Sequence, residues 1–212
     1  MNRDTTFIDL LKKRRSIRKF QERAIEQEKI DLLMEAALRS PSSRGFNPWE
    51  FIVVSEKETI EKLSAAKPHG AFFLAKAPLA IVVCADTKKT DVWVEDASIA
   101  TLILHLTATD LGLGSCWIQL RLREYDAHQS AGAYVANLLG LDDNMAVEAI
   151  MAIGYPKEQK PPHDIASLPF KKIHYERFGK ECHQKSRPNR YFIKTKITIL
   201  LRRLFGELWR RP

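Results

Sequence analysis

Residues 92–119, VWVEDASIATLILHLTATDLGLGSCWIQ, decide the fold of this chain. Between Asp96 and Leu111 the apolar residues surround almost the whole circumference of a helix, so this helix must be buried on more than one side. The stretch is shorter than the roughly 20 apolar residues that a bilayer requires, and polar residues interrupt it. It therefore predicts a central helix of a globular protein, or a helix shared by two subunits. The glycines that follow end the helix, and residues 115–120 are predicted to form a short buried strand.

Helical and strand patterns alternate on either side of this stretch. Thr5 or Thr6 can cap a first helix whose apolar residues follow i, i+3, i+4 spacing and which ends near Arg14 or Arg15. Further helices are predicted at 27–38, 57–66 and 131–139, and strands at 51–54, 79–84 and 147–153. Because no internal repeat occurs, these patterns predict one mixed domain with about four strands and at least five helices.

The positive charge of the chain is concentrated at its C-terminal end. The formal net charge is +8, but residues 180–212 carry ten Lys or Arg against two Glu, so residues 1–179 are neutral. A charge excess confined to one end is typical of an interaction tail and not of a basic domain. We therefore predict a globular domain over 1–179 and a basic extension over 180–212.

The cysteines and the N-terminus bear on the cellular compartment. Cys84, Cys116 and Cys182 form no CxxC pair, which favours a reducing, cytoplasmic compartment over a disulfide scaffold or a zinc site. The first 18 residues lack the uninterrupted apolar region of a signal peptide. We therefore expect a cytoplasmic protein.

A basic motif stands where the first helix is predicted to end. Arg14, Arg15, Ser16 and Arg18 bring three guanidinium groups and a hydroxyl together. Alternate side chains of an extended chain point to the same side, so Arg14, Ser16 and Arg18 would form a small clamp for an anion such as phosphate. The alternative is a solvated basic turn, because runs of charge usually lie on the surface.

The loop SPSSRGFNPW, residues 40–49, is the second motif. Its short polar groups are those of Ser42, Ser43 and Asn47, and Pro41 helps to fix its backbone. Such a loop suits a polar planar ligand and suits a structural turn equally well.

Several other chemistries lack their motifs. GLGS at 112–115 follows a helix and precedes a strand, which is the opposite order to a dinucleotide-binding fingerprint. The six histidines show no HxxxH, HxH or HExxH spacing, so no metal site is predicted. No GxSxG motif supports a serine nucleophile. Cys116 is interpreted as a small buried hydrophobe, although Gly114 and Ser115 could bring main-chain donors near a ligand.

Taken together, these stretches resemble the FMN-dependent nitroreductase family. The resemblance rests on RRSIRKF, on SPSSRGFNPWEFIVV, on DASIATLILHLTATDLGLGSCWI and on GYPKEQKPP followed by LPFKKIHYERF, which stand in family order over residues 5–178. It implies an α+β sandwich with a central mixed or antiparallel sheet flanked by helices. It also implies a homodimer that meets through the long central helix, with FMN at the subunit interface.

The resemblance further implies which residues bind FMN. The ribityl phosphate and the nearby flavin edge are assigned to Arg14, Arg15, Ser16 and Arg18. The isoalloxazine ring is assigned to Cys116, Trp117 and Ile118. The partner subunit is expected to contribute Pro41, Ser42, Ser43 and Asn47. Lys160 is chosen to complete the phosphate site, with Lys171 or Lys172 as substitutes. Gly45 departs from the family, whose loop often has Asn there, so one contact is either missing or made by Asn47.

The activity implied by the resemblance is that of an oxidoreductase. FMN would take a hydride from NADH or NADPH and pass electrons to nitro, quinone or related electrophilic acceptors, while the protein positions and tunes the flavin. No side chain is assigned as a catalytic acid or base. Two alternatives stay open. One is an FMN enzyme with another specific reaction, such as dehydrogenation or reductive dehalogenation, and the other is a non-enzymatic flavin-binding module tethered by its tail.

The C-terminal extension carries its own pattern. Taken as a helix, residues 193–209 gather six apolar side chains within about 100° of one side, with Lys196, Arg203 and Arg210 on the opposite flank. A basic amphipathic helix over 191–210 fits an anionic membrane surface, which would make the protein peripheral there, or a groove on a partner. Packing on its own dimer is the alternative. Nucleic acid is disfavoured because the apolar stripe would have no place on a phosphate backbone.

Overall fold

The computed structural model describes residues 6–180 of the chain. The chain divides between His163 and Asp164 into two units. Among the described residues, the first unit holds all strands and α-helices, and the second holds the short 3₁₀ turns η3 (Ile165–Ser167) and η4 (Phe170–Lys172). The amphipathic helix predicted over 191–210 lies outside the described residues, and the domain boundary predicted at residue 179 stays a prediction.

Four antiparallel strands form a single sheet in the order β1-β2-β4-β3. Their bounds are Trp49–Val54 for β1, Leu79–Asp86 for β2, Gly114–Gln119 for β3 and Met145–Gly154 for β4. The central strands β2 and β4 are almost continuously buried because both of their faces are covered. The α+β class is confirmed, and the sheet is antiparallel throughout.

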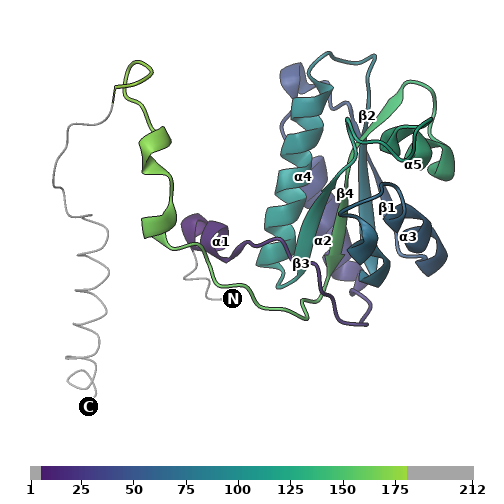
Figure 1. Cartoon of the computed structure of the whole chain (residues 1–212), viewed down its shortest axis with the longest axis horizontal. Coiled ribbons are helices and arrows are strands. Elements are labelled where there is room, and N and C mark those ends of the chain that lie inside the picture. The colour runs from purple at the N-terminus through teal and green to yellow at the C-terminus, as the bar shows by residue number, and fades with distance from the viewer. Residues whose placement is uncertain (1–5, 181–212) are drawn as a thin grey trace. The chain divides into compact units, whose positions relative to one another are not determined.

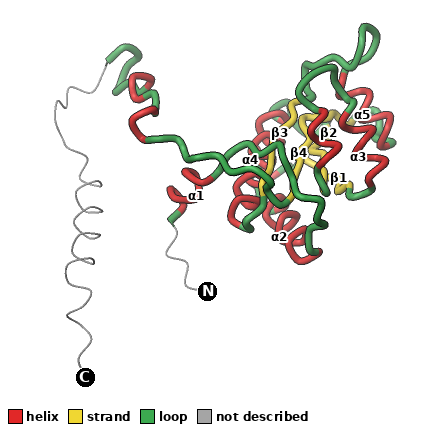
Figure 2. The backbone as a smooth tube through the Cα atoms, turned by 60° about the horizontal axis from the view of Figure 1, so that its bottom comes forward, coloured by secondary structure: helices red, strands yellow, loops and turns green. Residues whose placement is uncertain are grey.

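Helices cover both faces of the sheet (Figures 1 and 2). One face carries α2 (Gln27–Leu38) and α4 (Trp93–Asp110), and the other carries α3 (Lys57–Ser64) and α5 (Ala131–Leu139). Side chains of a strand alternate between its faces, so Ile81 and Val83 of β2 pack under α2 and α4 while Val82 packs on the opposite side. The result is a three-layer sandwich with one apolar core on each side of the sheet.

A central helix, α4, forms where the sequence predicts it, but only its sheet-facing side is buried. Its inward face is lined by small residues and one leucine, namely Ala97, Ala100, Leu104 and Ala108, all of them fully buried. On the outward face, Ile99 and Leu102 remain 40% and 49% exposed. Residues 6–180 of a single chain therefore leave the second apolar face of α4 uncovered. Within the described part of the chain, no helix combines the length and apolarity needed to cross a membrane.

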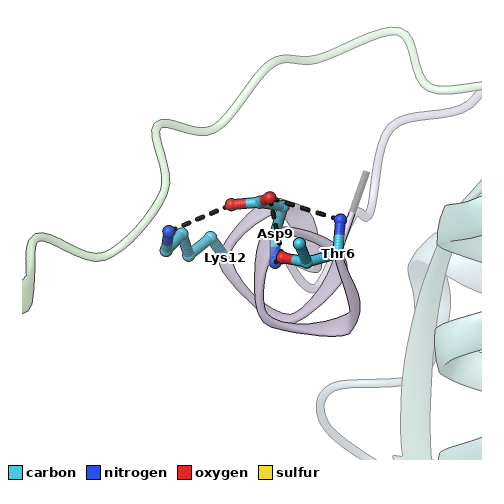
Figure 3. A network of polar contacts seen from close by, with 3 residues as sticks. All are labelled: Thr6, Asp9 and Lys12. Atoms are coloured by element: carbon cyan, nitrogen blue, oxygen red, sulfur yellow. Dashed lines mark hydrogen bonds and ion pairs between the residues drawn. The ribbon is translucent and has the colours of Figure 1, made fainter. Parts of the chain in front are cut away.

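The first helix, α1 (Phe7–Lys13), begins with a capping box at Thr6 (Figure 3). The Thr6 hydroxyl accepts a hydrogen bond from the Asp9 amide at 3.3 Å, and the Asp9 carboxylate accepts one from the Thr6 amide at 3.3 Å. Lys12 adds an ion pair with Asp9 at 3.0 Å. Because the helix ends at Lys13, the basic motif begins where the chain becomes extended, as predicted.

Two paired glycines allow that extended segment to lie against the sheet. Gly114 of β3 pairs with Gly154 of β4. A Cβ atom on Gly114 would lie 2.8 Å from Cγ2 of Ile17, and one on Gly154 would lie 2.9 Å from Cδ1 of Phe20. Both contacts are closer than side chains tolerate, so the absence of side chains at these two positions makes room for the buried Ile17 and Phe20.

Candidate functional site

The basic motif after α1 runs along the outer edge of β3. Ser16 forms a parallel bridge with Ser115, and the amide of Ile17 donates to the Ser115 carbonyl at 2.9 Å. Ile17 is buried, whereas its neighbours Ser16 and Arg18 are half-buried and exposed. This is the alternation expected of an extended chain, and it directs Ser16 and Arg18 to the side opposite the core.

Lys160 joins this motif from the segment that follows β4. Its Nζ atom donates to the main-chain carbonyl of Ser16 at 2.6 Å. The guanidinium of Arg15 donates to the carbonyl of Pro161 in the same segment. The structure thus brings the predicted residue Lys160 together with the predicted basic motif.

Glu158 is a member of the cluster that the sequence did not reveal. Its Oε1 atom accepts hydrogen bonds from the main-chain amides of Arg18 at 2.6 Å and Lys19 at 3.3 Å, and lies 3.3 Å from Nζ of Lys160. These donors, the Arg18 amide foremost, lower the pKa of the Glu158 carboxyl. A carboxylate therefore occupies a position that main-chain amides and an ammonium group make favourable for negative charge.

A buried histidine supports Arg14. Nε2 of His105 lies 2.9 Å from Nη1 of Arg14, and Nδ1 of His105 lies 2.5 Å from Oγ of Ser115. A guanidinium can only donate, so Nε2 accepts and Nδ1 carries the hydrogen that bonds Ser115. Burial, reinforced by the positive charge of Arg14, lowers the pKa of His105 to about 4. The imidazole is therefore neutral at pH 7.

Cys116, Trp117 and Ile118 alternate across β3. Ile118 packs on the side of α3 and α5, and strand alternation places the buried Cys116 on the same side. Trp117 packs on the side of α4 and donates through Nε1 to Oε1 of Gln119 at 2.8 Å. Burial raises the pKa of the Cys116 thiol despite the nearby charge of Arg18, so the thiol stays protonated. The side chains of these three residues therefore do not lie on one face of the strand.

The loop that contains Pro41 is attached to the other end of α4. Oγ of Ser42 donates to Oδ1 of Asn47 at 2.7 Å and accepts from the Asn47 amide at 2.9 Å. The amide of Ser43 donates to Oδ1 of Asp96 at 2.9 Å. Asp96 is 3% exposed, and its second carboxylate oxygen has no hydrogen-bond partner within the described residues. The loop is thus fixed both internally and to the helix.

The backbone of this loop contains a 3₁₀ turn, η1 (Ser43–Gly45), and several left-handed residues. Arg44 and Asn47 have φ angles of 52° and 46°, and Gly45 has a φ of 70°. Non-glycine residues held in this region cost on the order of 1–3 kcal/mol and cluster at ligand sites. Gly45 stands where the family often has Asn. Both residues adopt the left-handed conformation readily, so the same turn accommodates either one.

The two groups of predicted residues are attached to α4 nine positions apart, at Asp96 and His105. A helix rises 1.5 Å per residue, so these attachment points lie about 13 Å apart along the axis. Within one chain, the structure brings together the basic motif, the first residues of β3 and Lys160. It holds the loop with Ser42, Ser43 and Asn47 apart from them.

Comparisons with known proteins give the class to which this fold and site belong. Residues 11–68 and 64–155 match the Nitroreductase family. A relative from Archaeoglobus fulgidus, provisionally named NADH dehydrogenase/NAD(P)H nitroreductase, is 40% identical over 151 residues, which cover 69% of this chain and 83% of that protein.

Two solved structures are also similar. An FMN-dependent nitroreductase from Clostridium difficile R20291 has a TM-score of 0.80 and 48% identity, covering 81% of this chain and all of that chain. A structure from Bacteroides thetaiotaomicron, provisionally named NADH dehydrogenase/NAD(P)H nitroreductase, has a TM-score of 0.74 and 32% identity over 81% of this chain and 97% of that chain. The chain belongs to the nitroreductase family, as its sequence motifs indicated.

Proposed function

We propose that this chain is a homodimeric FMN-dependent oxidoreductase that takes electrons from NADH or NADPH and delivers them to nitro, quinone or related electrophilic acceptors. The printed names of its relatives, an FMN-dependent nitroreductase and an NADH dehydrogenase/NAD(P)H nitroreductase, support this proposal. The observation that carries it is the contact of Lys160 with the main-chain carbonyl of Ser16, which places Lys160 beside the basic segment of residues 14–18 at the edge of β3.

This cluster fits the two ends of FMN. The terminal phosphate is an anion, and guanidinium groups offer it paired donors while Lys160 offers a compact charge. The isoalloxazine ring has donors and acceptors along one edge, and β3 is an edge strand whose outer main-chain groups beyond Ser115 are available to such a ligand. We therefore assign the phosphate to Arg14, Arg15, Ser16, Arg18 and Lys160, and the ring to the strand segment of Cys116, Trp117 and Ile118.

The loop of the partner subunit would complete the same site. In one chain, Asp96 and His105 hold the loop and the basic motif about 13 Å apart along α4. Two α4 helices packed antiparallel through their exposed residues Ile99 and Leu102 would set the Asp96 end of one beside the His105 end of the other. We therefore assign Pro41, Ser42, Ser43 and Asn47 to the flavin bound mainly by the partner. This arrangement makes each site a product of two chains.

The chemistry that FMN supplies when bound is hydride uptake from a nicotinamide and electron delivery to an acceptor. The residues of this chain bind the flavin, orient it and shield it from solvent. Cys116 remains protonated and His105 remains neutral, so neither offers a charged acid or nucleophile at neutral pH. We assign no side chain as the proton donor to the acceptor.

The test uses the full-length protein purified without added flavin. A yellow protein that releases FMN on denaturation, and that oxidises NADH or NADPH when a nitro compound or a quinone is added, would support the proposal. A colourless protein that neither binds added FMN nor oxidises either nicotinamide would overturn it. Flavin reduction by a nicotinamide without turnover of any nitro compound or quinone would retain the cofactor and overturn the acceptor class.

A further inference from the structure

His105 stands out among the buried polar groups because it touches two elements of the site without lying in it. It is 5% exposed and projects from α4, and its ring nitrogens bond Arg14 on one side and Ser115 on the other. The carbonyl of Ser115 in turn accepts the amide of Ile17. Three hydrogen bonds therefore link Arg14 to His105, His105 to Ser115 and Ser115 to Ile17, and the main chain of residues 14–17 closes the ring.

We propose that His105 is a positioning residue that fixes the Arg14 guanidinium for the phosphate of FMN. The inference rests on the proposed function, because it concerns the same phosphate site. It adds a residue of α4 that does not itself contact the ligand. It also defines the chemical state required, which is a neutral ring with its hydrogen on Nδ1.

The Arg14–His105 pair would favour FMN binding because it holds the Arg14 side chain rigid. An arginine side chain has several rotatable bonds, and ordering it when the ligand binds opposes affinity. Here Nη1 is already committed to Nε2 of His105 at 2.9 Å, which leaves the remaining donors of the guanidinium to face the ligand. Since Ser115 anchors the other side of the imidazole at 2.5 Å, the ring itself cannot rotate without losing a bond.

Two amide substitutions separate the two sides of the ring. In His105→Gln the amide oxygen can take the place of Nε2 and still accept from Arg14. In His105→Asn the shorter amide reaches only the place of Nδ1 and serves Ser115 alone. Both variants put a neutral amide in the same buried position, so each controls for the disturbance caused by the other.

The measurement is the affinity of the flavin-free full-length protein for FMN and for riboflavin, which lacks the phosphate. We expect His105→Asn to weaken FMN binding about tenfold and to leave riboflavin binding unchanged, because a hydrogen bond that orients a charged donor is worth about one order of magnitude. We expect His105→Gln to retain most of the preference for FMN. In an Arg14→Ala background, His105→Asn should add no further loss.

The possible outcomes separate this inference from the proposed function. Equal weakening of FMN and riboflavin, equal behaviour of the two amide variants, or full additivity with Arg14→Ala would each overturn the positioning role while FMN binding by the unmodified protein stands. Failure of the unmodified protein to bind FMN would overturn the proposed function, and this inference with it.

Discussion

Nζ of Lys160 lies 2.6 Å from the main-chain carbonyl oxygen of Ser16, a residue 144 positions earlier in the chain. The contact joins the segment after the last strand to the segment after the first helix. Oε1 of Glu158 also lies 3.3 Å from Nζ of Lys160. Lys160 is therefore positioned by the cluster before any ligand arrives.

Replacement of Lys160 tests its assignment to the phosphate. We expect Lys160→Met to weaken FMN binding about tenfold, because it removes one charge and one donor from the anion site. Titration of the flavin-free protein by fluorescence would measure the change. The exposed Lys157, in the same segment, provides Lys157→Met as a control that lowers the net charge equally. Equal losses in both variants would show a general charge effect and contradict the assignment.

The histidine makes stability depend on pH in a defined direction. The folded-state pKa of His105 is about 4, below the ordinary value of 6.5, so the unfolded chain binds a proton first as pH falls. Its contribution is fully present above pH 6.5 and is lost as pH decreases toward 4, by on the order of 3 kcal/mol in total. Urea denaturation at pH 7.0 and 4.5 would measure this. In His105→Gln the difference in the free energy of unfolding between pH 7.0 and pH 4.5 should shrink. An unchanged difference would contradict the lowered pKa of His105.

The bond between Asp96 and Ser43 should control the mobility of the loop. In Asp96→Ala the Ser43 amide loses its acceptor, while Asp96→Asn keeps an oxygen at Oδ1. Loss of this bond should cost about 1–3 kcal/mol. Arg44 lies exposed in the loop, so tryptic cleavage after it, followed by mass spectrometry, reports loop opening. We expect faster cleavage in the Ala variant than in the Asn variant, and equal rates would show that the bond does not hold the loop.

The exposed apolar face of α4 allows the proposed dimer interface to be tested by mutation. Leu102 is 49% exposed on this face, whereas Val53 is 40% exposed on the edge strand β1. We expect Leu102→Glu to convert the dimer to monomer in sedimentation experiments and to lower FMN occupancy, because burying a carboxylate in an apolar interface is unfavourable. Val53→Glu should change neither. Dimerisation that persists in Leu102→Glu would contradict the proposed interface.

The paired glycines predict an effect on stability that can be measured without a ligand. A methyl group at Gly114 would lie 2.8 Å from Ile17, so Gly114→Ala should lower the free energy of unfolding by about 1–3 kcal/mol. In Gly132→Ala, within α5, the nearest atom lies 3.7 Å away, and this variant should be neutral or stabilising by up to about 1 kcal/mol. Thermal denaturation of both variants would show the contrast. A Gly114→Ala variant as stable as Gly132→Ala would mean that the N-terminal segment does not lie against β3.

Local patterns were sufficient for most of the fold. The helices predicted at 27–38 and 131–139 have those bounds in the structure, and Thr6 caps α1, because periodicity and capping depend on neighbours in sequence. Strands β1, β2 and β4 extend one or two residues past their predicted ends, whereas β3 has the predicted length and lies one residue earlier. Main-chain pairing, and not the side-chain pattern, sets where a strand ends, so strand ends are less predictable from sequence than strand centres.

The contacts that build the site were harder to predict because they join residues far apart in sequence. His105 lies 91 positions from Arg14, and Glu158 lies 140 positions from Arg18. A side-chain hydrogen bond across such a distance leaves no periodic trace in either segment. Gly114 shows the same difficulty, since the sequence indicates that it ends a helix, whereas the structure shows that its missing side chain also admits Ile17.

Because Asp96 and His105 are nine positions apart on α4, the proposed site draws its two halves from different chains, and this links FMN binding to protein concentration. When the two halves of a binding site reside on different chains, ligand binding and subunit association become linked, and each strengthens the other. The proposed enzyme would then lose flavin on dilution, and excess flavin would in turn favour association. Its specific activity would depend on its own concentration, because the dissociation constant of the dimer would set the lowest concentration at which the site is complete.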